Sequence, residues 1–137
     1  MILLDTQALV WFAQGDERLG AAAREMVATS LAAGKAAVSP ISFWEVAMLV
    51  SKGYLDLGRP PSAWAQEVCR TGKIIIAPLS PEIAIDAGSL PGDIHGDPAD
   101  RIIVATARGL ACPLLTSDRK ILAYADAGHV AATDARR

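Results

Sequence analysis

Short apolar runs alternate along this chain with longer stretches whose apolar residues recur at helical spacing. The short runs have the length of buried strands, and we expect strands over residues 2–4, 36–39, 74–77, 113–116 and 129–132. The longer stretches predict helices over residues 8–12, 19–33, 42–51, 62–70, 81–90, 98–108 and 119–125. Strands that are apolar along their whole length belong to parallel sheets covered on both faces by helices. The pattern therefore predicts an α/β fold, an α/β/α sandwich around a central five-stranded parallel sheet, in one domain over residues 1–137.

Local signals delimit several of these helices. Gly34, Gly72 and Gly109 each follow a helical stretch, where a residue without a Cβ most easily adopts the left-handed conformation that ends a helix. Asp97 and Pro98 form the usual helix start, a capping side chain followed by a residue that needs no N–H. A helix is therefore expected to begin at residue 98.

The composition is that of a compact globular protein, with 52% hydrophobic and 20% charged residues. The apolar runs are too short to span a bilayer and the first residues lack the basic region of a signal peptide, so we expect a cytoplasmic protein without a membrane partner. Cys69 and Cys112 lack metal-ligand spacing and are expected to be buried free thiols. The three tryptophans are expected in the core or at an interface, and residues 136–137 are expected to fray.

Four carboxylates fall where a strand passes into a helix or where a helix begins. Asp5 follows the first strand, Asp118 follows the fourth, and Glu45 and Asp100 lie in the first turns of their helices. Ligands of open α/β sheets bind outside the carboxyl ends of the strands, so the four side chains are expected to meet there. Neighbouring carboxylates repel one another unless a cation neutralises them, and Mg²⁺ or Mn²⁺ prefers such oxygen ligands. The sequence therefore predicts a divalent-metal site.

Each of these acids also has a purely structural explanation. Asp5 and Asp118 have the side chain of an N-cap residue, and Asp100 complements the dipole of its helix. Ser42 and Glu45 have the spacing of a capping box, in which Glu45 would reach back to the start of its own helix. The sequence alone leaves both explanations open.

Polar neighbours of the acids are candidates for a supporting role. Thr6, Thr116 and Ser117 are placed to hydrogen-bond a carboxylate, and turn capping explains the last two equally well. Arg101 has two open roles, contact with a substrate phosphate or support of an adjacent acid. His95 is expected to bond the loop backbone rather than a phosphate.

Six segments resemble the PIN-domain family, specifically the VapC-type ribonuclease toxins of type II toxin–antitoxin systems. They follow the family's order and spacing: MILLDT, SPISFWEVAML, KGYLDL, LSPEIA, HGDPADRIIVATA and PLLTSD. The resemblance implies a homodimeric endoribonuclease that depends on Mg²⁺ or Mn²⁺ and that a cognate antitoxin holds inactive. It also implies Asp5, Glu45, Asp100 and Asp118 as the acidic site. Gln7 stands where relatives often have His, so no role is assigned to this side chain.

The reaction implied by the resemblance is hydrolysis of an RNA phosphodiester by water, with one or two Mg²⁺ ions lowering the pKa of the water and stabilising the leaving oxygen. In a chain of net charge −2, an acidic pocket attracts phosphate only after it has bound cations, and basic side chains around it would assist. Candidates for these RNA contacts are Lys52, Arg101, Arg108, Arg119 and Lys120. The apolar residues that flank Glu45 exceed what one buried helix face needs, which indicates a surface for a second copy or for an antitoxin.

Other functions fit parts of the pattern. A receiver domain also holds acids and Mg²⁺ above a parallel sheet, but it accepts phosphate on an Asp after the third strand, where this chain has Ala77, Pro78 and Leu79. The receiver function is therefore excluded. A metal-dependent DNase on the same acids and an inactive PIN-like interaction module remain alternatives.

Overall fold

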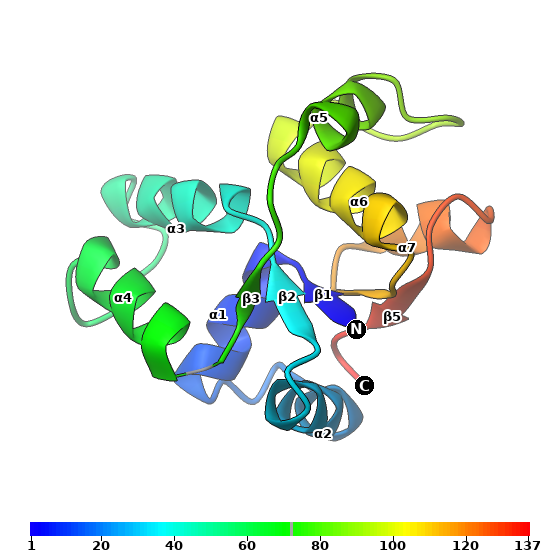
Figure 1. The fold of residues 1–137 in the computed structure, drawn as a ribbon. Coiled ribbons are helices and arrows are strands. Elements are labelled where there is room, and N and C mark those ends of the chain that lie inside the picture. The colour runs from blue at the N-terminus through cyan, green and yellow to red at the C-terminus, as the bar shows by residue number, and fades with distance from the viewer. Residues whose placement is uncertain (72) are drawn as a thin grey trace.

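The computed structural model describes residues 1–71 and 73–137, and within them it contains one five-stranded sheet and seven helices. The strands are β1 (Ile2–Leu4), β2 (Ala36–Val38), β3 (Ile75–Ile76), β4 (Leu114–Thr116) and β5 (Ala132–Asp134). The helices are α1 (Thr6–Gln14), α2 (Ala21–Ala32), α3 (Ile41–Ser51), α4 (Pro61–Thr71), α5 (Pro81–Gly88), α6 (Pro98–Leu110) and α7 (Arg119–Asp126). The strands lie in the order β3-β2-β1-β4-β5, with every neighbouring pair parallel (Figure 1). The expected five-stranded parallel sheet is confirmed.

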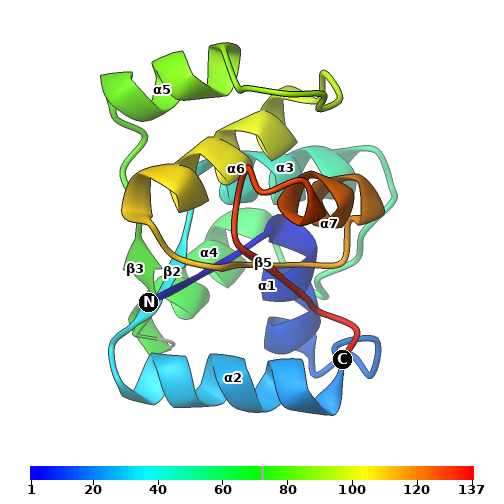
Figure 2. The ribbon, with the colours of Figure 1, turned by 90° about the vertical axis from the view of Figure 1, so that its right-hand side faces the viewer.

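Each face of the sheet has its own hydrophobic core. Successive residues of a strand point to opposite faces, so Leu3 and Leu114 pack with residues of α5, α6 and α7, whereas Leu4 and Leu115 pack with residues of α1, α2, α3 and α4. Figure 2 shows α5 and α6 on one side of the strands and α1 and α2 on the other. Because both faces are covered, the central strands are apolar except at Thr116, a buried polar residue that ends β4, and this produces the apolar runs seen in the sequence.

The last strand lies later in the chain than expected. β5 covers Ala132–Asp134 instead of residues 129–132, because α7 ends at Asp126 and the chain then turns through residues 127–130. His129 stacks on Tyr124 at a centroid distance of 4.6 Å, and Val130 is buried in the loop that follows. The predicted start of this strand was wrong because Val130 packs into the core from a loop rather than from a strand.

One expected helix end also differs. Gly109 lies inside α6, and Ala111 takes the left-handed C-cap conformation instead, with φ of 50°. A Cβ at position 109 would approach Ile83 Cγ1 to 3.2 Å, so this glycine permits α5 and α6 to pack closely. Gly34 follows α2 as expected, with φ of 69°, and Gly72 lies outside the described residues.

The two cysteines differ in burial, and so do the tryptophans. Cys112 is buried as expected, but Cys69 is exposed, because five helical residues rotate it away from the buried Trp64 of the same helix. Trp11 is buried in the core, whereas Trp44 on α3 is 57% exposed.

The end of the chain is held against α2 rather than frayed. The N–H of Ala22 donates to the carbonyl of Arg137 (2.9 Å), and the N–H of Gly20 donates to the carbonyl of Ala135 (2.9 Å). Figure 2 shows this end beside the first turn of α2. In the described part of the chain, no helix is both long enough and apolar enough to cross a membrane.

Candidate active site

The four acids predicted from the sequence line one pocket at the carboxyl ends of the central strands. This pocket has a volume of about 640 Å³ and lies where the strand order reverses, between β1 and β4. Asp5 comes directly after β1, Asp118 follows β4, Glu45 projects from α3 and Asp100 from the first turn of α6. The pocket is lined by Asp5, Thr6, Gln7, Glu45, Leu49, His95, Asp97, Asp100, Ser117, Asp118, Arg119, Lys120 and Arg136.

Asp5 connects the ends of the two central strands. Its Oδ1 accepts the N–H of Ala8 (2.8 Å) and so caps α1, while its Oδ2 accepts the hydroxyl of Thr116. The same Thr116 oxygen accepts the N–H of Asp118 at 3.0 Å. Thr116 therefore fixes both acids, the supporting role expected from the sequence.

Glu45 does not belong to a capping box. The helix begins at Ile41, and Ser42 lies inside it without capping its N-terminus. Glu45 instead accepts the hydroxyl of Thr6, whose oxygen lies 3.0 Å from the Ser42 hydroxyl. Since Thr6 has one hydroxyl proton, Ser42 donates to Thr6 when Thr6 donates to Glu45. The local sequence pattern was misleading because these contacts join residues 36 and 39 positions apart.

Asp97, Asp100 and His95 line the pocket from the start of α6 and the loop before it. The Asp97 carboxylate caps α6 by accepting the N–H of Asp100 at 3.2 Å. His95 Nδ1 accepts the N–H of Asp97 at 3.4 Å, the backbone role expected for it, while its Nε2 lies 3.4 Å from Asp100 Oδ2. Within the described residues, His95, Asp100 and Asp118 offer ligand atoms that lie within 4.8 Å of one another.

Asp118 caps a helix and lines the pocket at the same time. Its Oδ1 accepts the N–H groups of Lys120 (2.8 Å) and Ile121 (3.1 Å) at the start of α7. The capping bonds of Asp5 and Asp118 therefore hold the two carboxylates beside the pocket. For these acids, capping and participation in a site are compatible explanations.

A sequence model of the PIN domain matches residues 2–127 of the chain. The chain belongs to the PIN-domain family. Its relative ribonuclease VapC22 of Mycobacterium tuberculosis (strain ATCC 25618 / H37Rv) is 32% identical over 123 residues, which are 90% of this chain and 91% of VapC22.

Solved structures resemble this PIN-domain protein over nearly its whole length. A chain of a toxin-antitoxin complex from Klebsiella pneumoniae matches with a TM-score of 0.57 and 24% identity, covering 88% of both chains. A chain of VapBC2 from Rickettsia felis, bound to a DNA fragment from its promoter, matches with a TM-score of 0.67 and 17% identity, covering 97% of this chain and 98% of the other. At these identities the likeness establishes the PIN fold.

Burial and mutual repulsion make the carboxylates of this PIN domain reluctant to ionise. Burial raises the pKa of Asp5 from 3.8 to about 6, against the hydrogen bonds from Thr116 and Ala8, which lower it. Burial, and then the negative charges of Asp97 and the other pocket acids, raise the pKa of Asp100 from 3.8 to about 7. Burial also raises the pKa of Glu45, against the hydrogen bond from Thr6. The pocket therefore favours bound protons or a bound cation.

This charge distribution predicts the pH dependence of the metal-free protein. Asp5 and Asp100 have higher pKa values in the folded than in the unfolded chain, so folding binds protons between about pH 4 and pH 7. Their stabilising contribution is present at acidic pH and is lost as the pH rises through 6 and 7. We expect a higher melting temperature at pH 5.0 than at pH 7.5 in EDTA, measured by circular dichroism. A smaller difference in the Asp100→Asn variant would assign the effect to the pocket, and a higher melting temperature at pH 7.5 would contradict it.

The donor set fits a hard divalent cation. The pocket offers oxygen atoms from Asp5, Glu45, Asp100 and Asp118, the ligands that Mg²⁺ and Mn²⁺ prefer. A carboxylate oxygen that accepts one hydrogen bond retains a second lone pair for a metal. A bound cation would also relieve the repulsion that raises the pKa values of Asp5 and Asp100.

Arg101 and Arg108, two of the candidates for RNA contacts, do not line the pocket. Arg101 donates to the carbonyls of Ala87 (2.8 Å) and His95 (3.5 Å), so it holds the backbone around the site rather than an acid. Arg108 pairs with Asp86 at 2.9 Å, away from the pocket. Arg119 and Lys120 do line the pocket.

Two charged residues of the pocket were not assigned to it from the sequence. Asp97 was interpreted only as a helix cap, although a capping acid in the same turn as Asp100 was a signal for a second role. Arg136 reaches the pocket because β5 lies beside β4, a proximity that no local pattern indicates.

Proposed function

We propose that this PIN-domain protein is a metal-dependent endoribonuclease and the toxin of a toxin–antitoxin pair. The observation that carries the proposal is the convergence of Asp5, Glu45, Asp100 and Asp118 on one pocket at the strand ends. The printed name of the relative VapC22, a ribonuclease with 32% identity over 90% of the chain, supports the reaction class. The presence of all four carboxylates argues against an inactive interaction module.

In this proposal the four carboxylates hold Mg²⁺ or Mn²⁺, and the cation when bound activates water and stabilises the charge that develops on the scissile phosphate. The protein supplies the geometry. Thr116 orients Asp5, Thr6 orients Glu45, and the helix N-termini hold Asp5 and Asp118. Arg119 and Lys120 provide positive charge at the edge of the same pocket.

The proposal includes a cognate antitoxin and a homodimer. The solved chains with the same fold come from toxin-antitoxin assemblies, which supports an antitoxin as partner. Trp44 is 57% exposed and Tyr54 is 77% exposed, beside the apolar residues of α3 that the sequence assigned to a contact surface. Exposed aromatic side chains of this size are typical of interface anchors.

The purified protein should cleave single-stranded RNA in Mg²⁺ or Mn²⁺ and stop when EDTA removes the metal. A gel assay should compare single-stranded RNA, structured RNA and single-stranded DNA of matched sequence. Cleavage of RNA but not of DNA would support the proposal, and cleavage of DNA alone would favour the alternative substrate. Undiminished cleavage in EDTA would contradict the role of the metal.

A further inference from the structure

Arg136 brings a positive charge to the pocket from a different element than Arg119 and Lys120. It follows β5, whose last residue, Asp134, pairs with Thr116 at the end of β4. The Arg136 side chain lines the pocket and donates to the carbonyl of Ser117 at 2.5 Å, one residue before Asp118. The lining of the pocket therefore includes five acids, and three basic residues that come from α7 and from the segment after β5.

The backbone around Arg136 is fixed on both sides. The N–H of Arg136 donates to Asp134 Oδ1 at 2.9 Å, and Gly20 and Ala22 at the start of α2 donate to the carbonyls of Ala135 and Arg137. The approach at Gly20 is so close that a Cβ there would lie 2.0 Å from the carbonyl carbon of Arg137. Glycine at position 20 therefore permits the tail of residues 135–137 to pack against α2.

The guanidinium group has more donors than its protein contacts use. An arginine side chain has five N–H donors. The Arg136 side chain donates one hydrogen bond, to the carbonyl of Ser117, and its Cζ lies 6.0 Å from the Trp11 ring centroid. Across residues 1–71 and 73–137 it forms no salt bridge with an acidic side chain. Planar donors that are fixed on one side and directed into a pocket on the other suit a phosphate group.

We propose that Arg136 binds a backbone phosphate of the substrate next to the scissile one, and that packing of the tail on α2 through Gly20 positions it. This inference rests on the proposed nuclease function and adds a binding residue and a direction to it. A substrate strand that crosses the acids would leave the pocket over β5 and α7, where Arg136, Arg119 and Lys120 lie. A purely structural Arg136 would only satisfy the Ser117 carbonyl and cover Trp11.

Kinetics on a labelled single-stranded RNA separate these two roles. Arg136→Gln should raise KM about tenfold and change kcat less than threefold, because a charge-assisted contact to a phosphate that does not react is lost. The slope of log(kcat/KM) against log[NaCl] should become shallower by about 0.7, the value for one phosphate contact on a single strand. Arg136→Lys should restore the slope but only part of KM, since it retains the charge without the planar donors.

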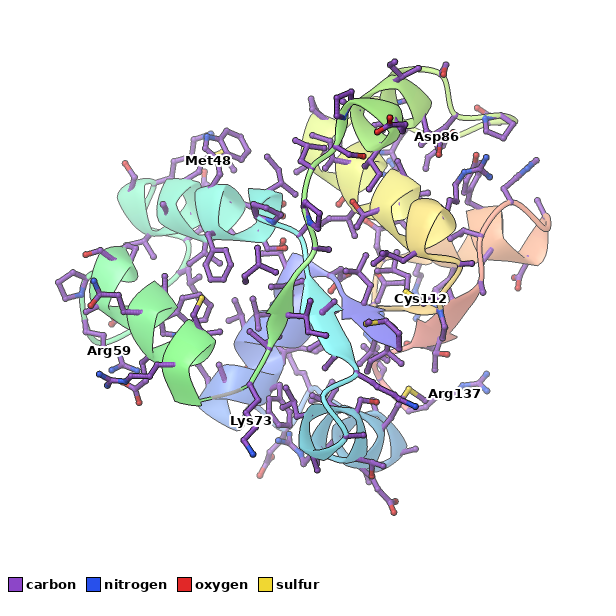
Figure 3. All side chains as sticks on the ribbon, viewed as in Figure 1. Met48, Arg59, Lys73, Asp86, Cys112 and Arg137 are labelled. Carbon is purple, nitrogen blue, oxygen red and sulfur yellow. The ribbon has the colours of Figure 1, made fainter. Side chains whose placement is uncertain are left out.

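Arg137→Gln is the matched control, because it removes the same charge from the neighbouring residue. Arg137 is not among the pocket residues and extends away from the sheet beside α2 in Figure 3. Its KM and salt slope should equal those of the wild type. Equal losses in both variants would reduce the effect to net charge and overturn the assignment.

Gly20→Ala tests the positioning of the tail without removing Arg136. The added Cβ should displace residues 135–137 and raise KM as Arg136→Gln does, with the circular dichroism spectrum unchanged. Wild-type kinetics in Arg136→Gln, with RNA cleavage intact in the parent, would overturn this inference and leave the proposed function standing. A parent protein that cleaves no RNA would overturn both.

Discussion

Replacing Asp100 by Asn should lower RNA cleavage by about 100- to 1000-fold, because transition-state stabilisation by a metal amounts to several kcal/mol and each 1.36 kcal/mol is tenfold in rate. Asn has nearly the same size as Asp, so the fold should persist. The pKa of Asp100 is raised to about 7 by burial and by the neighbouring acids, and the variant should therefore melt at a higher temperature than the parent in EDTA at pH 7.5. Rates come from initial velocities in Mg²⁺ and stability from thermal melts.

Asp93→Asn is a suitable control, because Asp93 is an exposed acid of the preceding loop that does not line the pocket. It makes the same chemical change and should leave the rate within about twofold, as surface substitutions do. If Asp100→Asn folded normally and cleaved RNA as fast as the parent, Asp100 would be only a first-turn residue of α6.

Replacing Glu45 by Gln should lower the cleavage rate by a similar factor while the protein remains folded. Gln retains the oxygen that accepts the Thr6 hydroxyl but provides no negative charge for a cation. Raising the Mg²⁺ concentration should recover part of the activity if weaker metal binding is the cause. Initial rates over a range of Mg²⁺ concentrations measure this dependence.

Ser42→Ala distinguishes orientation from charge at Glu45. Ser42 is fully buried and lies 3.0 Å from Thr6, so its loss should cost about 1 kcal/mol of unfolding free energy and little activity. Parent-like cleavage by Glu45→Gln at limiting Mg²⁺ would remove Glu45 from the site and leave Asp5, Asp100 and Asp118.

The sequence was most informative where local pattern and topology coincide. Asp5 and Asp118 follow strands that are buried on both faces, and such strands are parallel, so their carboxyl ends had to meet at one edge. Asp100 followed from the start of its helix, which Asp97 and Pro98 mark in the sequence. These three positions therefore required no knowledge of distant contacts.

The remaining features depend on contacts between distant parts of the chain. Glu45 and Ser42 matched a capping box, yet both interact with Thr6, the first residue of α1. Arg136 was expected in a frayed end. The contact that holds this end joins Gly20 to Arg137, 117 positions away, and no local pattern indicates it. Local patterns describe which conformations are favourable and do not specify which surfaces meet.

The most direct test of the central claim is a calorimetric titration of Mn²⁺ into the metal-free protein and into Asp100→Asn at pH 7.5. A pocket of four carboxylates that exists to hold a cation should bind Mn²⁺ in the parent, and loss of one ligand should weaken the affinity by at least about tenfold. Failure of the parent to bind Mn²⁺ at millimolar concentration, or equal affinity in both proteins, would contradict the assignment of this pocket as a metal site.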